Sequence, residues 1–396
     1  MIRHLLKLVW NRKRANALII TEIFLSFIVV FAVLAAVITF WSYWRLPLGY
    51  DYHDVWDVQM GFDVDAGSAD NPQLRDTLRR LVAEAKTFPE VESVGGSNTP
   101  PYQFSTSEGV WRIQGKDVRL MFDDVTDGFA DVMRIKPIRG RWFNADDDAA
   151  NYQAVVVDER TARALYGESD PVGQKFDPDG DRPMQVVGVV PSYRKDGEMS
   201  GPHNMVFSRY SLVRPVGRMG SHLMIRVRPG TGAAFEARLM KRLEATAPAI
   251  SMQLTRMEQA RGFAHRFMAA PVIAGGVIAL FLISMVALGL TGILWQSVTR
   301  RTREIGLRRA MGASGGGVHT QILLEVILLT TLALIVGVIV VWQFPLLGIF
   351  TIVPPAVYTA AFIASLLAIY AITVTCGLYP SWLASRLTPA DALRYE

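Results

Sequence analysis

Four long apolar runs constrain this chain more than any other feature of its sequence. Each contains about 20 or more mostly apolar residues, enough for an α-helix rising about 1.5 Å per residue to cross a hydrocarbon layer about 30 Å thick. A buried helix of a soluble protein is the alternative, but such helices rarely extend this far without a charge. We therefore expect four transmembrane helices, at Ala17–Trp41, Met268–Trp295, Gln321–Trp342 and Ala356–Tyr379.

A secretory signal peptide is the alternative for the first run, because basic residues precede it. Its apolar stretch is about twice the usual signal length. It ends in Trp41-Ser42-Tyr43-Trp44 rather than in a small-residue cleavage site. An uncleaved span is favoured. The single cysteine, Cys376, lies in the fourth run, so we expect neither a disulfide within the chain nor a thiolate metal site.

The distribution of positive charge predicts the orientation, because Lys and Arg gather at the cytoplasmic ends of membrane helices. Five of them precede the first acid, Glu22, and five arginines follow the second run against the single acid Glu304. The loop Gln343–Pro355 has no charge. Both termini and the loop after the second run are expected in the cytoplasm, and the long segment between the first two runs outside.

The N-terminal segment, residues 1–16, has an apolar and a basic side around Leu5–Trp10. This pattern predicts an amphipathic helix in the inner membrane interface. A basic extension of the first span is the alternative.

The outer segment repeats a strand–helix–strand order at its two ends, which predicts one split α/β lobe with a second lobe inserted at about 100–215. Apolar periodicity gives the elements. The strands expected at the two ends are Val55–Val64, Val91–Val94, His222–Val227 and Ile250–Leu254, and the helices begin at Asn71-Pro72 and cover Gly232–Ala245.

The inserted lobe is expected to be mixed α/β. Two acidic stretches within it, Asp146-Asp147-Asp148 and Asp177–Asp181, are interpreted as solvated turns. The second lacks the ligand periodicity and closing Glu of a calcium loop. The predicted elements of this lobe are strands at Val110–Ile113, Ala154–Val157 and Met184–Val190 and helices at Val125–Met133 and Glu159–Tyr166.

No motif for catalysis occurs in the chain. It lacks a phosphate-binding G-x-x-x-x-G-K-[ST] loop, H-E-x-x-H and G-x-S-x-G. Its six histidines are scattered and unpaired in the sequence. We expect no enzymatic site, no metal site, no cofactor site and no nucleic-acid partner for this chain.

The sharpest local signal is the basic segment Thr299–Ser314. Leu307, Ala310 and Met311 follow i, i+3, i+4 spacing and form one apolar edge, and Gly312 is a natural helix stop. Such a helix under a membrane bundle suits docking into a groove of a cytoplasmic partner. A basic loop that binds anionic lipid headgroups is the other interpretation. The residues alone leave both open.

A resemblance favours docking. Arg301–Ala313, R-T-R-E-I-G-L-R-R-A-M-G-A, resembles the signature of the FtsX-like/MacB-type permease family, as do the opening of the third run, Gln321–Glu325, and the C-terminal Tyr379–Arg394. Asp391 stands where that family usually has Glu, and the flexible Gly315–Gly317 departs from its polar stretch. The similarity covers essentially the whole chain, including landmarks at Arg139–Phe143, Asp170–Gln174 and Val186–Val190.

The resemblance implies a multi-pass permease subunit of an ABC transporter in the bacterial cytoplasmic (inner) membrane, with one span before and three spans after a periplasmic domain. ATP and Mg²⁺ would bind a separate ATPase dimer, since this chain opens with its own interfacial helix. A second permease copy or paralogue is the expected membrane partner, with membrane lipid around both. A periplasmic adaptor and an outer-membrane duct are further expected partners. The implied mechanism is mechanotransmission, from ATPase closure to motion of the outer domain.

The resemblance also assigns roles to residues. The coupling helix to the ATPase would comprise Arg303, Glu304, Ile305, Leu307, Arg308, Arg309, Ala310, Met311 and Gly312.

Two acids, Glu22 and Glu325, lie about one turn inside their spans, where each either snorkels or pairs with a cytoplasmic arginine. No deeper acid accompanies them, so a proton relay is not expected.

Three functions fit this architecture: export of peptides, antibiotics or other amphiphiles, regulation of a cell-wall hydrolase as in division-linked relatives, and lipoprotein extraction. The large two-lobed outer domain favours export. The expected boundaries are 17–44 for the first span with its extension, 45–255 for the outer domain, 256–298 for the second span with its extension, 299–319 for the coupling loop, 320–343 and 356–380 for the third and fourth spans, 344–355 for the short outer loop and 381–396 for the C-terminal segment.

Overall fold

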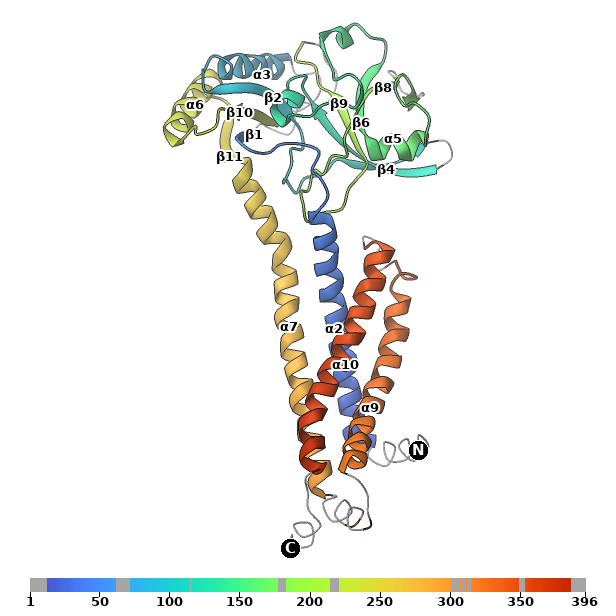
Figure 1. Ribbon diagram of the computed structural model, residues 1–396. Coiled ribbons are helices and arrows are strands. Elements are labelled where there is room, and N and C mark those ends of the chain that lie inside the picture. Colours follow the sequence, from blue (N-terminus) through green and yellow to red (C-terminus); the bar gives the residue numbers. More distant parts are fainter. Residues whose placement is uncertain are drawn as a thin grey trace. The chain divides into compact units, whose positions relative to one another are not determined.

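The chain forms two compact units, each with its own core (Figure 1). The helical unit comprises Met1–Ser42 and Ala269–Glu396, and the sheet domain comprises Tyr43–Met268. The computed structural model describes residues 13–61, 72–113, 116–176, 183–213, 221–300, 307, 311, 315–348 and 353–385.

Four long helices confirm the four predicted spans. Within the described residues, each is long and apolar enough to cross a membrane, over Ala17–Trp44, Met257–Gly292, His319–Gln343 and Pro355–Leu378. Residues 13–16 begin the first helix, whereas residues 1–12 of the expected interfacial helix lie outside the described part. The four helices are α2 (Lys13–Trp44), α7 (Met257–Arg300), α9 (Gly315–Gln343) and α10 (Pro355–Ser385).

The helical unit is packed around aromatic rings of α2. Phe27 is fully buried and meets Phe362 of α10 edge to face, with ring centroids 6.3 Å apart. Gly337 of α9 lies against the same ring, since a Cβ at that position would come within 2.5 Å of Phe27 Cδ1. Hydroxyls join α9 to α10, which run side by side (Figure 1), with Thr330 and Thr373 3.1 Å apart. Close packing and polar pairs of this kind hold helices together in lipid.

The sheet domain contains one continuous path of strands in the order β11-β1-β10-β2-β4-β9-β6-β8-β5, with β3 on β4 and β7 on β8. Its first lobe has two interleaved strand–helix–strand units, because β1 pairs antiparallel with both β10 and β11, and β10 pairs antiparallel with β2. Figure 1 shows both helices of this lobe on the same face of the sheet. The elements are β1 (Val55–Gly61), α3 (Pro72–Ala85), β2 (Val91–Ser97), β10 (His222–Val227), α6 (Ala233–Thr246) and β11 (Ser251–Arg256).

The inserted lobe extends that sheet through a narrow connection. The pairing of β2 with β4 consists of Ser97 opposite Val125. Each lobe has a hydrophobic cluster of its own, and a further cluster, which contains Met224 of the first lobe and Phe129 of the inserted lobe, joins the two. The lobe comprises β3 (Glu108–Ile113), β4 (Lys116–Val125), α4 (Phe129–Met133), β5 (Arg139–Gly140), η2 (Ala145–Asp148), β6 (Gln153–Asp158), α5 (Glu159–Tyr166), β7 (Lys175–Phe176), β8 (Met184–Val190) and β9 (Met205–Arg209).

Two sequence predictions for the inserted lobe were wrong. Val125 ends a strand, and only Phe129–Met133 of the expected helix is helical. The chain turns between them at Gly128, where a Cβ would lie 2.2 Å from the carbonyl oxygen of Val94. The proximity of β2 therefore fixes the turn, and the local apolar pattern does not reveal it.

The triple aspartate at 146–148 is also not a solvated loop. Asp147 is 5% exposed and accepts hydrogen bonds from Arg141 Nη1 and Nη2 at 2.7 and 2.6 Å. Asp148 binds Arg209 at 2.7 Å. Arg141 is only six residues from Asp147, but Arg209 is 61 residues from Asp148, so the fold is needed to bring that partner to its carboxylate. The acidic stretch at 177–181 lies outside the described residues, as do residues 62–64 of the first predicted strand.

Candidate functional site

Most of the predicted coupling helix lies outside the described residues: Arg303, Glu304, Ile305, Arg308, Arg309, Ala310 and Gly312. Leu307 and Met311 are described, with exposed fractions of 62% and 74%. The backbone N–H of Met311 donates to the carbonyl of Leu307 at 3.0 Å, which is the i, i+4 bond of one helical turn. The described part of the chain therefore leaves both apolar side chains exposed.

The two predicted membrane acids lie on different helices. Glu22 of α2 is half-buried, and its Oε2 would be 3.2 Å from a Cβ built on Gly289 of α7. Glycine at 289 thus makes room for the carboxyl group. Glu325 is half-buried on α9, beside the buried Val326.

The most elaborate polar arrangement lies where α2 ends in the sheet domain. Arg194 is 1% exposed, and its Nη1 donates to the carbonyls of Tyr43 and Leu46, both at 2.9 Å. The last carbonyls of a helix have no partner inside the helix, and a cation there is favoured by the helix dipole. Arg194 therefore caps the C-terminus of α2.

The same guanidinium organises its own loop. Nη2 of Arg194 donates to the carbonyls of Glu198 at 2.9 Å and Ser200 at 2.6 Å. Burial lowers the pKa of Arg194, while the charge of Glu198 opposes that shift. We call the segment Arg194–Ser200 the junction loop. The buried guanidinium therefore donates to four carbonyl oxygens in place of water, two at the end of α2 and two in the junction loop, and so holds the loop to the helix.

The junction loop also holds the first turns of α7. Glu198 is 7% exposed and accepts hydrogen bonds from Arg261 Nε at 2.7 Å and His265 Nε2 at 2.8 Å. Tyr102 donates its hydroxyl to the same carboxylate at 3.3 Å. Burial acts to raise the pKa of Glu198, but the bonds from Arg261 and His265 and the charge of Arg261 outweigh it, so that the pKa is lowered.

Aromatic contacts join the two helix ends directly inside the sheet domain. The Trp44 and His265 rings have centroids 5.3 Å apart, and the guanidinium of Arg261 lies 5.9 Å from the Trp44 centroid. Met257 and Ala264, in the first two turns of α7, are buried in a core cluster that includes Val55 of the first lobe and Phe207 of the inserted lobe. The end of α2 and the beginning of α7 are thereby fixed to one another and to the sheet domain.

Residues that sequence reasoning missed include four histidines, each beside a carboxylate. The most buried pair is His222 with Asp57, at 2.9 Å on adjacent strands β10 and β1. The members of this pair are 165 residues apart, so no local spacing indicates it. Among the described residues no group of three or more His, Cys, Asp or Glu could hold a metal ion. The other pairs are His53 with Asp51, His203 with Asp196 and His265 with Glu198.

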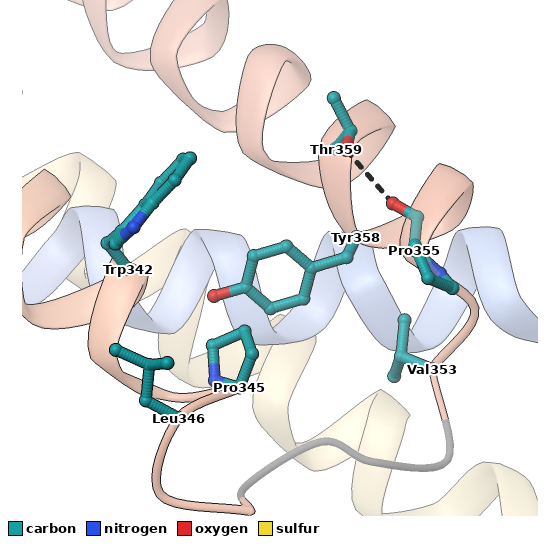
Figure 2. A pocket seen from close by; sticks show the side chains of 7 residues that line it. All are labelled: Trp342, Pro345, Leu346, Val353, Pro355, Tyr358 and Thr359. Atoms are coloured by element: carbon teal, nitrogen blue, oxygen red, sulfur yellow. Dashed lines mark hydrogen bonds between the residues drawn. The ribbon is translucent and has the colours of Figure 1, made fainter.

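A separate apolar pocket of about 380 Å³ lies in the helical unit where α9 ends and α10 begins (Figure 2). Tyr358 projects between the two segments and donates its hydroxyl to the carbonyl of Val341. The lining has no carboxylate or amine, so this pocket suits an alkyl chain rather than a charged ligand. It is lined by Trp342, Pro345, Leu346, Val353, Pro355, Tyr358 and Thr359.

Comparison with known proteins agrees with this architecture. The model of the MacB-like periplasmic core domain matches residues 17–242, and that of the FtsX-like permease C-terminal region matches residues 276–389. The chain belongs to the MacB-like permease family. Its first match covers more than half of the sequence, including the sheet domain up to α6.

Individual relatives are ABC transporter permeases by name. The chain is 25% identical to the uncharacterized ABC transporter permease YknZ of Bacillus subtilis, over 74% of each protein. It is 26% identical to the macrolide export ATP-binding/permease protein MacB of Neisseria gonorrhoeae, over 77% of this chain and 48% of that protein. The chain thus spans about half the length of the MacB relatives.

Solved structures of periplasmic and extracellular regions are similar at a low level. The periplasmic region of MacB from Actinobacillus actinomycetemcomitans matches 55% of this chain and 94% of that one, with 18% identity and a TM-score of 0.36. The extracellular domain of YknZ from Gram-positive bacteria matches 50% of this chain and 99% of that one, with 16% identity and a TM-score of 0.34.

Proposed function

We propose that this chain is the membrane permease subunit of an ABC transporter and that it passes the motion of a separate cytoplasmic ATPase to its periplasmic sheet domain. The output of that motion is export of peptides, antibiotics or other amphiphiles. The ATPase binds ATP and Mg²⁺, and this chain carries no cofactor. A second permease copy or a paralogue completes the membrane assembly, in the bacterial cytoplasmic membrane.

The observation that carries the proposal is the double anchorage of the junction loop. Arg194 holds the end of α2, and Glu198 holds the beginning of α7. A displacement of either helix along or across its axis therefore acts on the same seven-residue segment and, through it, on the sheet. A loop with only solvent-exposed contacts would absorb such a displacement instead.

The exposed side chains of Leu307 and Met311 support the proposal that the motion enters this chain from the ATPase. Exposed apolar side chains next to a basic segment suit a partner with an apolar groove and an acidic rim. Export is favoured by similarity to the macrolide export proteins. An adaptor and an outer-membrane duct are the partners we propose for the periplasmic side.

Co-purification tests the coupling edge. We expect the double variant Leu307→Asp/Met311→Asp to insert in the membrane but to lose the separate ATPase subunit that co-purifies with the unmodified chain. Leu346→Asp is the matched control, since Leu346 is 81% exposed in the same unit and follows the C-terminal end of α9 at Gln343. Normal recovery of the ATPase with the double variant would refute the docking assignment. A periplasmic pulldown that recovers a cell-wall hydrolase and no adaptor would refute the export output.

A further inference from the structure

Three phenylalanines, two of them on the first part of α7, form an exposed cluster in the sheet domain. Phe104, Phe263 and Phe267 have exposed fractions of 52%, 55% and 60%. The ring centroids of Phe104 and Phe267 lie 4.7 Å apart, and those of Phe104 and Phe263 lie 6.2 Å apart. With about 100 Å² open on each ring, the patch covers about 300 Å², the size at which exposed apolar surface is often functional.

The backbone around Phe104 is fixed by hydrogen bonds, although the ring itself is exposed. Lys195, in the junction loop, has a side chain that is 3% exposed and donates to the carbonyls of Gln103 at 3.0 Å and Ser105 at 2.5 Å. These two carbonyls flank Phe104. Burial lowers the pKa of Lys195, so this anchor is costly. A buried cation thus fixes a phenylalanine that remains half in solvent.

The other two rings come from α7, where i, i+4 spacing places Phe263 and Phe267 on one face. Arg261 and His265, on a different face, are bound to Glu198. The exposed Arg266 follows Phe263 by three residues, so helical spacing puts the two on neighbouring positions of the helix surface, and the only acid of α7 is Glu258, in its first turn. The charge that α7 itself presents next to the apolar patch is therefore positive.

The position along α7 indicates what reaches the patch. Phe267 directly precedes the apolar run that begins at Met268. At about 1.5 Å per residue, Phe263 and Phe267 lie within about 10 Å of the start of that predicted run, in the N-terminal part of the longer candidate span Met257–Gly292, so that an alkyl chain at the edge of a bilayer crossed by the run could reach them. Interface anchors are usually Trp and Tyr, whose polar atoms face the headgroups. Phenylalanine has no such atom, and its exposed ring suits an alkyl chain that has left the bilayer.

We propose that Phe104, Phe263, Phe267 and Arg266 form a docking site for an anionic single-chain amphiphile, with its alkyl chain on the rings and its head on the arginine. The inference rests on the proposed export function and names the substrate class for this surface. The junction loop carries both the helix anchors and Lys195, so the site is attached to the element that receives the motion of α2 and α7.

Photo-cross-linking of the full chain in phospholipid nanodiscs tests the proposal. The probe is palmitic acid with a diazirine near the end of its chain, and the labelled peptides are mapped by mass spectrometry. We expect saturable labelling at Phe104, Phe263 or Phe267, competed by unlabelled palmitate. The variant Phe104→Ser/Phe263→Ser/Phe267→Ser should lose at least tenfold of this labelling.

Val110→Ser/Ile138→Ser/Val213→Ser is the matched control, because those residues are 64%, 50% and 68% exposed elsewhere on the sheet domain, and it should label normally. Arg266→Glu should reduce labelling by the palmitic acid probe severalfold. A second probe, hexadecanol with the same diazirine, has no charge, and its labelling should be unchanged in this variant. This second variant preserves the rings and therefore remains informative if the triple variant misfolds.

Three results would overturn the proposal. Label confined to the apolar runs would place the amphiphile in the bilayer only. Equal labelling of the three rings by a diazirine carried on a phospholipid would identify bilayer lipid as the occupant. A disulfide-linked dimer of Phe267→Cys would identify a second copy. Since ATPase recovery with Leu307→Asp/Met311→Asp is measured separately, failure of this site and failure of the transport assignment are distinguishable.

Discussion

The guanidinium of Arg194 lies 2.9 Å from the carbonyl oxygens of both Tyr43 and Leu46, so that one buried side chain closes the end of a 32-residue helix. Its Nη2 donates to two carbonyls of the junction loop. This arginine therefore links α2 to the loop that also holds α7. Its geometry depends on a planar group with donors in fixed directions.

Replacement of Arg194 by Lys should destabilise the sheet domain. An ammonium has three donors and cannot span four carbonyls, which leaves buried acceptors unpaired. We expect a loss of roughly 2–4 kcal/mol in the opening free energy of residues around 43–48 and 194–200, measured by native-state hydrogen exchange on the full chain. Arg228→Lys is the control, because Arg228 is exposed and should change stability by less than about 0.5 kcal/mol. Equal exchange in both variants would contradict a structural role for the arginine.

Replacement of Glu198 by Gln should have a pH-dependent effect. The folded-state pKa of Glu198 is lowered from its ordinary value of 4.5, so its ionised form stabilises the fold above that pH. This stabilisation is lost as the pH falls through the folded-state pKa. The Tm of the unmodified chain should therefore exceed that of Glu198→Gln at pH 6–7, and the difference should shrink below about pH 4.5. A difference that stays constant or grows toward acid pH would exclude this linkage.

The buried pair of Asp57 and His222 should show strong coupling. Both residues are 4% exposed, and Gln103 is a weaker third partner, 3.4 Å from Asp57. His222→Leu leaves a carboxylate buried with little compensation and should cost about 3–5 kcal/mol of unfolding free energy. Asp57→Leu/His222→Leu should cost at least about 1 kcal/mol less than the sum of the single changes. Additive losses in chemical denaturation would show that the pair does not act as a unit.

Helix packing in the helical unit can be tested at two glycines. Gly337→Ala would place a Cβ 2.5 Å from Phe27 Cδ1, and the fully buried ring has no free space to yield into. We expect a loss of about 1–3 kcal/mol, measured as a lower Tm in detergent. Gly276→Ala in α7 is the control, since a Cβ there has no atom within 4 Å, and it should be neutral. Equal Tm values for the two variants would contradict the close approach of α9 to α2.

Much of the fold was predictable because it rests on local periodicity. The strand Met184–Val190 and the helix Glu159–Tyr166 have the bounds that the sequence predicts. The helix expected at Val125–Met133 failed, because the turn at Gly128 depends on Val94 from another strand. The coupling residues were found by motif similarity and remain a prediction. Arg194 and Glu198 were not found, since nothing near them in the sequence distinguishes them from surface charges.

The sequence by itself determined the four apolar helices, the segment inserted between the first two, and the resemblance to the permease family. These features follow from the length and composition of contiguous runs of sequence. Such runs determine a membrane span or a regular helix or strand without contacts from distant parts of the chain. The tertiary structure alone decided which charges are buried and what they hold. Residues as far apart as Tyr43 and Arg194 meet only when the sheet is complete. A buried ion is stable only where the folded backbone offers it enough acceptors, and that arrangement has no local signature in the chain.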